Sequence, residues 1–188
     1  MPPILVFTPF LRRVSDGKFF RSAFPIFFQG CAVLAALGSL YGSYLLWRTV
    51  NREMAFNGFL ALALTQLLLL ALGLVAVNVL LVRAEDAKAI TQTEGIVTPM
   101  VAIALRAAGE VLGAAQVIGG VAIAVLGWLN EGWAAQRIFG PFWLAKPTDG
   151  VLAILLGFLY GFAVLAFFYF VAELASALWA VERNTRRK

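Results

Sequence analysis

The chain has 188 residues, of which 62% are hydrophobic and 13% charged, and its formal net charge is +5 at pH 7. Soluble domains are typically about half apolar and a quarter charged, so this composition argues against one and favours a polytopic membrane protein. The absence of histidine excludes His-ligated haem and chlorophyll, most zinc and copper sites, and the commonest general base.

Motifs for catalysis or cofactor binding are also missing from the sequence. It contains no H-E-x-x-H, G-x-S-x-G, C-x-x-C or P-loop pattern. The single cysteine, Cys31, lies inside an apolar run and is interpreted as a packing residue. We therefore expect no enzyme activity, no catalytic residues, no cofactor and no metal site. Most basic residues stand at the ends of apolar runs, as membrane topology requires, so we expect no nucleic-acid partner.

The first 21 residues mix prolines, aromatic residues and basic residues. Pro2, Pro3 and Pro9 argue against a long regular helix, and the apolar part is too short to span a membrane. We expect an interfacial arm over residues 1–21 on the cytoplasmic side. It does not resemble a cleaved signal peptide, because the apolar stretch that follows it is too long.

Four long apolar runs follow, and each can cross a hydrocarbon core of about 30 Å as a helix rising ~1.5 Å per residue. Thr98 and Pro99 are typical of an N-cap and a first helical residue, which indicates where the third run begins. The sequence therefore predicts an all-α protein, a four-transmembrane-helix bundle over residues 22–183. Its spans are expected at about 22–47, 54–82, 99–129 and 151–181.

The segments between and after the spans have recognisable compositions. Residues 130–150 alternate aromatic residues with polar and turn residues, which predicts an interfacial loop. The second helix is expected to continue into the charged stretch 84–90. Residues 184–188 form a basic cytoplasmic tail, which we expect to fray.

The distribution of basic residues predicts the orientation. With four spans, both termini and the second loop share one side of the membrane. Ten basic residues fall on that side and four on the other, so the positive-inside rule places both termini in the cytoplasm. The ten are Arg12, Arg13, Lys18, Arg21, Arg83, Lys88, Arg183, Arg186, Arg187 and Lys188, and the four are Arg48, Arg52, Arg137 and Lys146.

Three of the four spans carry a G-x-x-x-G motif, which lets helix backbones approach closely in lipid. The second span lacks the motif and is rich in leucine. We therefore expect the first, third and fourth helices to form a close-packed centre, with the second facing lipid on a broad side. The motif residues are Gly38 and Gly42, Gly109 and Gly113, and Gly157 and Gly161.

Polar residues at a similar depth in all four spans indicate a layer across the bundle. Ionisable groups in a membrane are costly and usually pair or face a cavity. Arg106 and Glu110 are spaced i,i+4 and can pair on one helix, and a glutamate on the fourth helix could join them. This layer is interpreted as helix-to-helix contacts that set the register, or alternatively as an ion site or a polar groove for a lipid headgroup. Its members are Gln29, Asn78, Arg106, Glu110 and Glu173.

Two segments carry a resemblance to known proteins. Residues 167–187, with Glu173 and the run Glu182-Arg183-Asn184, resemble the end of a family of small uncharacterised bacterial multi-pass membrane proteins. Residues 18–27 are similar to the aromatic entry of the same family. The resemblance implies a bacterial membrane protein and no known activity.

These observations predict a protein of the bacterial inner membrane that contacts lipid and associates with other membrane subunits or with itself. The first hypothesis is a structural or accessory subunit of a larger complex. The second is an oligomeric ion or small-molecule conduit lined by Glu110 and Glu173. The third is a lipid-handling membrane protein.

Overall fold

The computed structural model describes residues 18–48, 56–90, 97–129 and 150–186, and nearly all of them are helical. Four helices follow one another: α2 (Lys18–Arg48), α3 (Phe56–Ala89), α4 (Val97–Trp128) and α6 (Gly150–Arg186). Each is long and apolar enough to cross a membrane. The predicted fold class, an all-α four-helix membrane protein, is confirmed, and we treat the chain as an integral membrane protein.

The helices extend beyond the predicted spans at several ends. α3 continues to Ala89, which confirms the expected continuation into the charged stretch, because the residues after Arg83 are mostly good helix formers. α4 begins at Val97, two residues before the expected first position; Pro99 fits there because the first turn needs no internal N–H donor. α6 runs through Arg186, so much of the expected tail is helical. The interpretations of residues 1–17, 130–149 and 187–188 lie outside the described residues.

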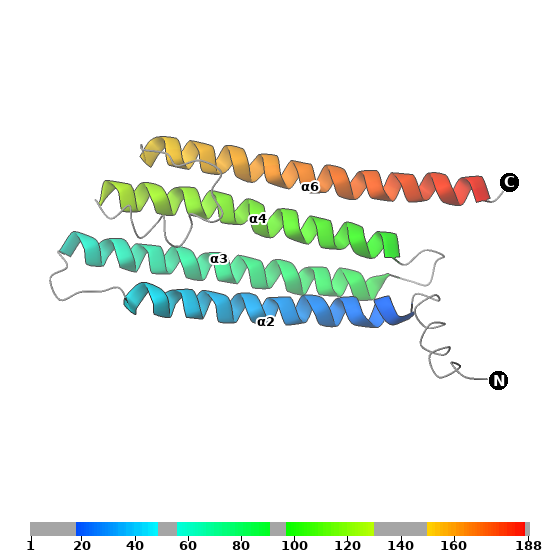
Figure 1. Ribbon diagram of the computed structural model, residues 1–188, viewed down its shortest axis with the longest axis horizontal. Coiled ribbons are helices and arrows are strands. Elements are labelled where there is room, and N and C mark those ends of the chain that lie inside the picture. The colour runs from blue at the N-terminus through cyan, green and yellow to red at the C-terminus, as the bar shows by residue number, and fades with distance from the viewer. Residues whose placement is uncertain (1–17, 49–55, 91–96, 130–149, 187–188) are drawn as a thin grey trace, which may run out of the picture.

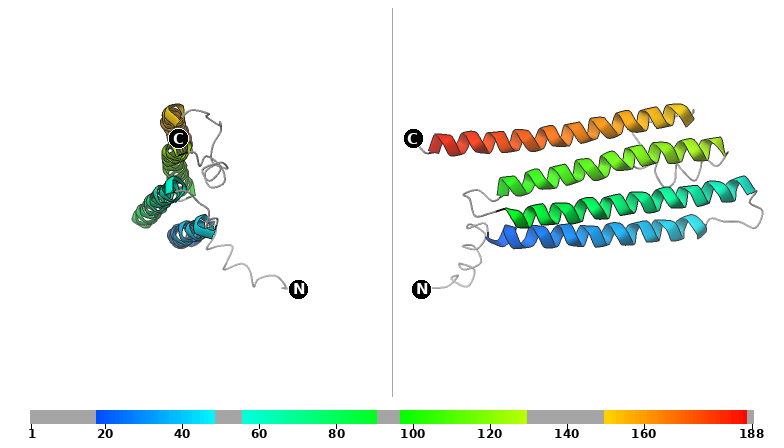
Figure 2. Two further views of the ribbon diagram at one scale, coloured as in Figure 1. Left: turned by 90° about the vertical axis from the view of Figure 1, so that its left-hand side faces the viewer. Right: turned by 180° about the vertical axis from the view of Figure 1, so that it is seen from behind.

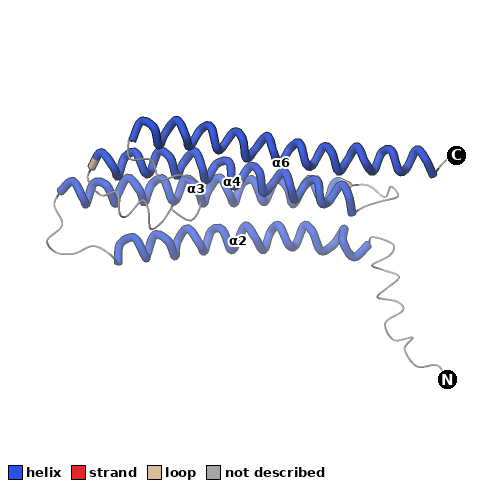
Figure 3. Tube along the Cα trace, turned by 45° about the horizontal axis from the view of Figure 1, so that its top comes forward, coloured by secondary structure: helices blue, strands red, loops and turns tan. Residues whose placement is uncertain are grey.

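The helices lie side by side in a row, in the order α2, α3, α4, α6 (Figure 1). The end-on view in Figure 2 shows α6, α4 and α3 one below another, with α2 beside α3. Figure 3 shows the same long, nearly parallel axes from another angle. α3 and α4 are therefore the inner helices, and α2 and α6 form the two ends of an open row.

Two small clusters of buried side chains hold α2, α3 and α4 together, one near each end of these helices. The first consists of Phe28, Ala84, Ala87, Met100 and Ala107. The second consists of Leu46, Ala61, Leu62 and Leu126. Much of the buried surface belongs to alanine and glycine, so the contact energy comes from close backbone approach rather than from large core side chains.

The α4–α6 pair packs through glycines from both helices. A Cβ atom built on Gly161 would lie 2.8 Å from the carbonyl oxygen of Gly113, and one on Gly157 would lie 2.9 Å from that of Gln116. A Cβ on Gly109 would lie 2.6 Å from the Cβ of Phe168. The predicted motifs of the third and fourth spans therefore lie in the same α4–α6 interface.

The expected centre, made of the first, third and fourth spans, is wrong. α2 packs mainly on α3, where Gly42 meets Leu69, whereas a Cβ on Gly38 would meet nothing within 4 Å. α3 is an inner helix because small residues recur along its buried side without forming a strict G-x-x-x-G. These buried residues of α3 are Gly58, Ala61, Leu62, Thr65, Leu69, Gly73, Ala76, Ala84 and Ala87.

Candidate functional site

A charged cluster joins three of the four helices near the C-terminal end of α3. The Nε of Arg83 on α3 donates to Oε2 of Glu110 on α4 at 3.2 Å, and its Nη2 donates to Oε1 of the same carboxylate. The remaining Nη1 donates to Asp86, one turn further along α3, at 2.7 Å. This fork geometry is the strong form of an ion pair, because two parallel charge-assisted hydrogen bonds fix both groups.

Tyr169 brings the last helix into the same cluster. Its hydroxyl donates to Oε1 of Glu110 and accepts a hydrogen bond from Nη2 of Arg83 at 3.2 Å. The side chains of Arg83 and Glu110 are only 17% and 20% exposed. We call Arg83, Asp86, Glu110 and Tyr169 the Glu110 cluster. It links α3, α4 and α6 through one carboxylate.

Arg106 lies beside this cluster but does not pair with Glu110, the interaction that the i,i+4 spacing suggested. Its guanidinium carbon lies 5.7 Å from the centre of the Tyr169 ring, a cation–π contact. Its Nε is buried without a hydrogen-bond partner. Among the described residues no carboxylate lies within ion-pair distance of Arg106. Arg83 takes its place because α3 packs against the side of α4 that carries Glu110.

The other three members of the predicted polar layer stay apart. The side chains of Gln29, Asn78 and Glu173 are exposed on α2, α3 and α6 respectively. The structure thus gathers Glu110 and Arg106 and leaves the rest on outer faces. Spacing along single helices predicts a similar depth for these residues, but the side each one faces depends on how the helices are rotated against one another.

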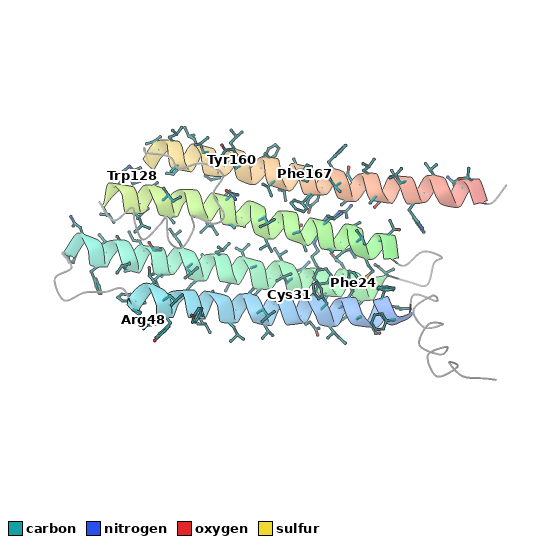
Figure 4. The ribbon with its side chains drawn as sticks, viewed as in Figure 1. Phe24, Cys31, Arg48, Trp128, Tyr160 and Phe167 are labelled. Carbon is teal, nitrogen blue, oxygen red and sulfur yellow. The ribbon has the colours of Figure 1, made fainter. Side chains whose placement is uncertain are left out.

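The depth of the Glu110 cluster can be estimated by counting residues from the opposite end of the helices. Figure 4 shows Arg48 and Trp128 at that end, and Gly150 packs on Trp128, since a Cβ built on it would lie 2.5 Å from the indole nitrogen. Glu110 and Tyr169 lie roughly 27–29 Å from this level at ~1.5 Å per residue. A hydrocarbon core is about 30 Å thick. The cluster therefore fits one edge of the core, with Trp128 at the other.

A second polar contact lies between α2 and α3. The side-chain amide of Gln66 donates to the hydroxyl of Ser43 at 2.8 Å, and Ser43 donates to the carbonyl of Ser39 at 2.7 Å. The amide oxygen of Gln66 is buried without a partner. One interhelical hydrogen bond of this kind stabilises a membrane pair by roughly 0.6 kcal/mol on average.

Three residues of the cluster were not singled out from the sequence. In the sequence, Arg83 and Asp86 resemble the charged residues that commonly end a span. Tyr169 is one of several aromatic residues in the fourth apolar run. A depth signal existed: Tyr169 stands about as far from the start of α6 as Glu110 stands from the end of α4. No family model, curated protein or solved structure matches the chain.

Proposed function

We propose that the protein is a structural or accessory subunit of a larger membrane protein complex and has no catalytic activity of its own. The observation that carries this proposal is the set of hydrogen bonds that the Glu110 carboxylate accepts. Its two oxygens accept hydrogen bonds from Arg83 and Tyr169, which come from two other helices. A carboxylate that carries ions has to exchange its partner for the ion. A carboxylate that is paired with a fixed guanidinium is better suited to hold two helices together.

The open row of helices also supports a subunit role. α2 and α6 are each packed mainly on one neighbour, which leaves their other sides to lipid or to other proteins. Large apolar side chains stand on those sides, among them Leu37 and Leu40 on α2 and Phe162 and Phe170 on α6. Large exposed apolar surfaces mark membrane or protein contacts.

The proposed location is the inner membrane of a bacterium, with both termini in the cytoplasm. The ten-to-four distribution of basic residues supports this orientation. The resemblance of residues 18–27 and 167–187 to small bacterial multi-pass membrane proteins supports the bacterial origin.

Purification from native membranes in a mild detergent tests the proposal. The expected result is that other membrane proteins co-purify in a fixed ratio with the wild-type chain and are lost with Glu110→Gln. Purification of the chain as a self-only oligomer contradicts it. So does an ion flux in proteoliposomes that Glu110→Gln combined with Glu173→Gln abolishes while the same proteins still co-purify, because that result identifies a conduit.

A further inference from the structure

A groove runs along the α4–α6 contact on the side that carries Glu110. Its volume is about 270 Å³. Gly113 and Gly161 line it where the backbones of α4 and α6 pack closely, and the aromatic rings of Phe158 and Phe162 also line it. Both rings are more than half exposed, so the groove opens to the outside of the row. The full lining is Glu110, Gly113, Ala114, Val117, Phe158, Gly161, Phe162 and Leu165.

The groove covers the depth of one membrane leaflet. Its inner end, at Phe158 and Val117, lies roughly 12–17 Å from the Trp128 level at ~1.5 Å per residue, close to the middle of the membrane. Its other end, at Glu110, lies at the edge of the hydrocarbon core. Each leaflet contributes about half of the ~30 Å core. The groove therefore matches the length of one lipid acyl chain in its leaflet.

Two opposite charges stand just beyond the polar end of the groove. Arg106 lies one turn before Glu110 on the same side of α4, and Glu173 lies one turn after Tyr169 on α6. Both lie roughly 33–35 Å from the Trp128 level, which is the headgroup zone outside the ~30 Å core. Neither makes an ion pair with any described residue, and the Nε of Arg106 is buried without a partner.

We propose that this face of the α4–α6 pair binds one phospholipid with an ethanolamine headgroup. The phosphate pairs with Arg106, the headgroup ammonium pairs with Glu173, and one acyl chain lies in the groove over Gly113 and Gly161. Arginine binds phosphate through parallel hydrogen bonds, and basic pockets between membrane helices bind phospholipid headgroups.

The charges of the site favour this occupant over an apolar helix. A partner helix in the groove would cover Arg106 and leave its charge unpaired at the membrane edge, which is costly. A zwitterionic phospholipid supplies one anion and one cation at the depth where the chain supplies one cation and one anion. The inference is independent of the subunit role, because a lipid can occupy the site in an assembled subunit and in a free chain.

Native mass spectrometry of the full chain in detergent, with dioleoyl phosphatidylethanolamine or dioleoyl phosphatidylglycerol added, tests the proposal. Wild-type protein is expected to retain one molecule of phosphatidylethanolamine. Arg106→Gln should weaken retention roughly 10- to 100-fold, the range for a hydrogen bond between charged groups. Glu173→Gln should remove a roughly two- to fivefold preference for ethanolamine over glycerol, the range for an exposed ion pair.

Two further variants separate the site from general lipid contact. Ala114→Phe fills the groove without touching the glycines that join α4 and α6, and it should lower retention of both lipids. Arg48→Gln makes the same chemical change as Arg106→Gln at the opposite, exposed end and should leave retention unchanged.

Thermal unfolding in detergent shows whether each variant is folded. Retention that is equal in wild-type, Arg106→Gln and Ala114→Phe protein, all folded, overturns the proposal. A lipid-free dimer of the wild-type chain that Ala114→Phe dissociates also overturns it, because a second copy then occupies the groove.

Discussion

Replacing Gly161 by alanine tests the glycine contact that joins α6 to the rest of the protein. The new Cβ would lie 2.8 Å from the carbonyl oxygen of Gly113 and 2.8 Å from a methyl carbon of Val117. Ordinary contact distances for carbon are about 3.5–4.0 Å, so the helices must separate by roughly half an ångström or more. The carbonyl belongs to the backbone of α4 and cannot rotate away as a side chain would.

The same substitution at Gly38 is the matched control, since a Cβ there would meet nothing within 4 Å. Both changes add one methyl group to a helix interior and gain the same helix propensity, up to about 1 kcal/mol. That term cancels in the comparison. What remains is the steric cost at Gly161, which we expect to be about 1–3 kcal/mol, the usual range for overpacking.

Reversible unfolding in mixed detergent micelles, followed by circular dichroism, measures this difference. Gly161→Ala should unfold more easily than Gly38→Ala by that amount. If the two variants are equally stable, or Gly161→Ala is the more stable, α4 and α6 do not approach closely at this glycine. That result would contradict the described packing of α6 on α4.

Further predictions concern the polar contacts and the orientation. Ser43→Ala should destabilise the α2–α3 contact by about 0.6–2 kcal/mol because the amide of Gln66 loses its acceptor. Gln66→Leu should be nearly neutral in the same unfolding assay. A larger loss of stability in Gln66→Leu than in Ser43→Ala would contradict the contact. Tyr169→Phe keeps the aromatic ring beneath the Arg106 guanidinium and loses only the hydroxyl. It should lower the unfolding free energy by about 0.5–1.5 kcal/mol. An unchanged value would mean that the Tyr169 hydroxyl does not contribute to the Glu110 cluster. A cysteine placed at Asn184 in a Cys31→Ser background should react with an impermeant maleimide only when the cytoplasmic face is accessible, and labelling from outside intact cells would reverse the predicted orientation.

The four helices could be predicted because length and hydropathy determine a membrane span with little help from tertiary structure. The contact between Gly113 and Gly161 could also be predicted, since close approach of backbones requires small residues. The order of the helices in the row could not be predicted from the sequence. The small residues of α3 are a mixture of alanine, glycine and threonine, which carries the same packing information as G-x-x-x-G in a less recognisable form.

The partner of Glu110 could not be found from spacing alone. Arg106 is near in sequence, but Arg83 approaches from another helix and forms the ion pair. That choice depends on how α3 and α4 are rotated and shifted against each other, which sequence periodicity does not specify. Arg83 also ends an apolar run, where a basic residue is ordinarily explained by topology. Its role as a helix tie became visible only with the neighbouring helices in place.

A double-mutant cycle between Arg83 and Glu110 tests whether the Glu110 carboxylate holds the helices together. The unfolding free energies of wild-type protein, Arg83→Gln, Glu110→Gln and the double variant give the coupling between the two side chains. We expect a favourable coupling of about 1–3 kcal/mol, larger than that between Arg83 and the more exposed Asp86. A coupling within about 0.3 kcal/mol of zero would mean that the carboxylate does not hold the helices, and the proposed structural role would be contradicted.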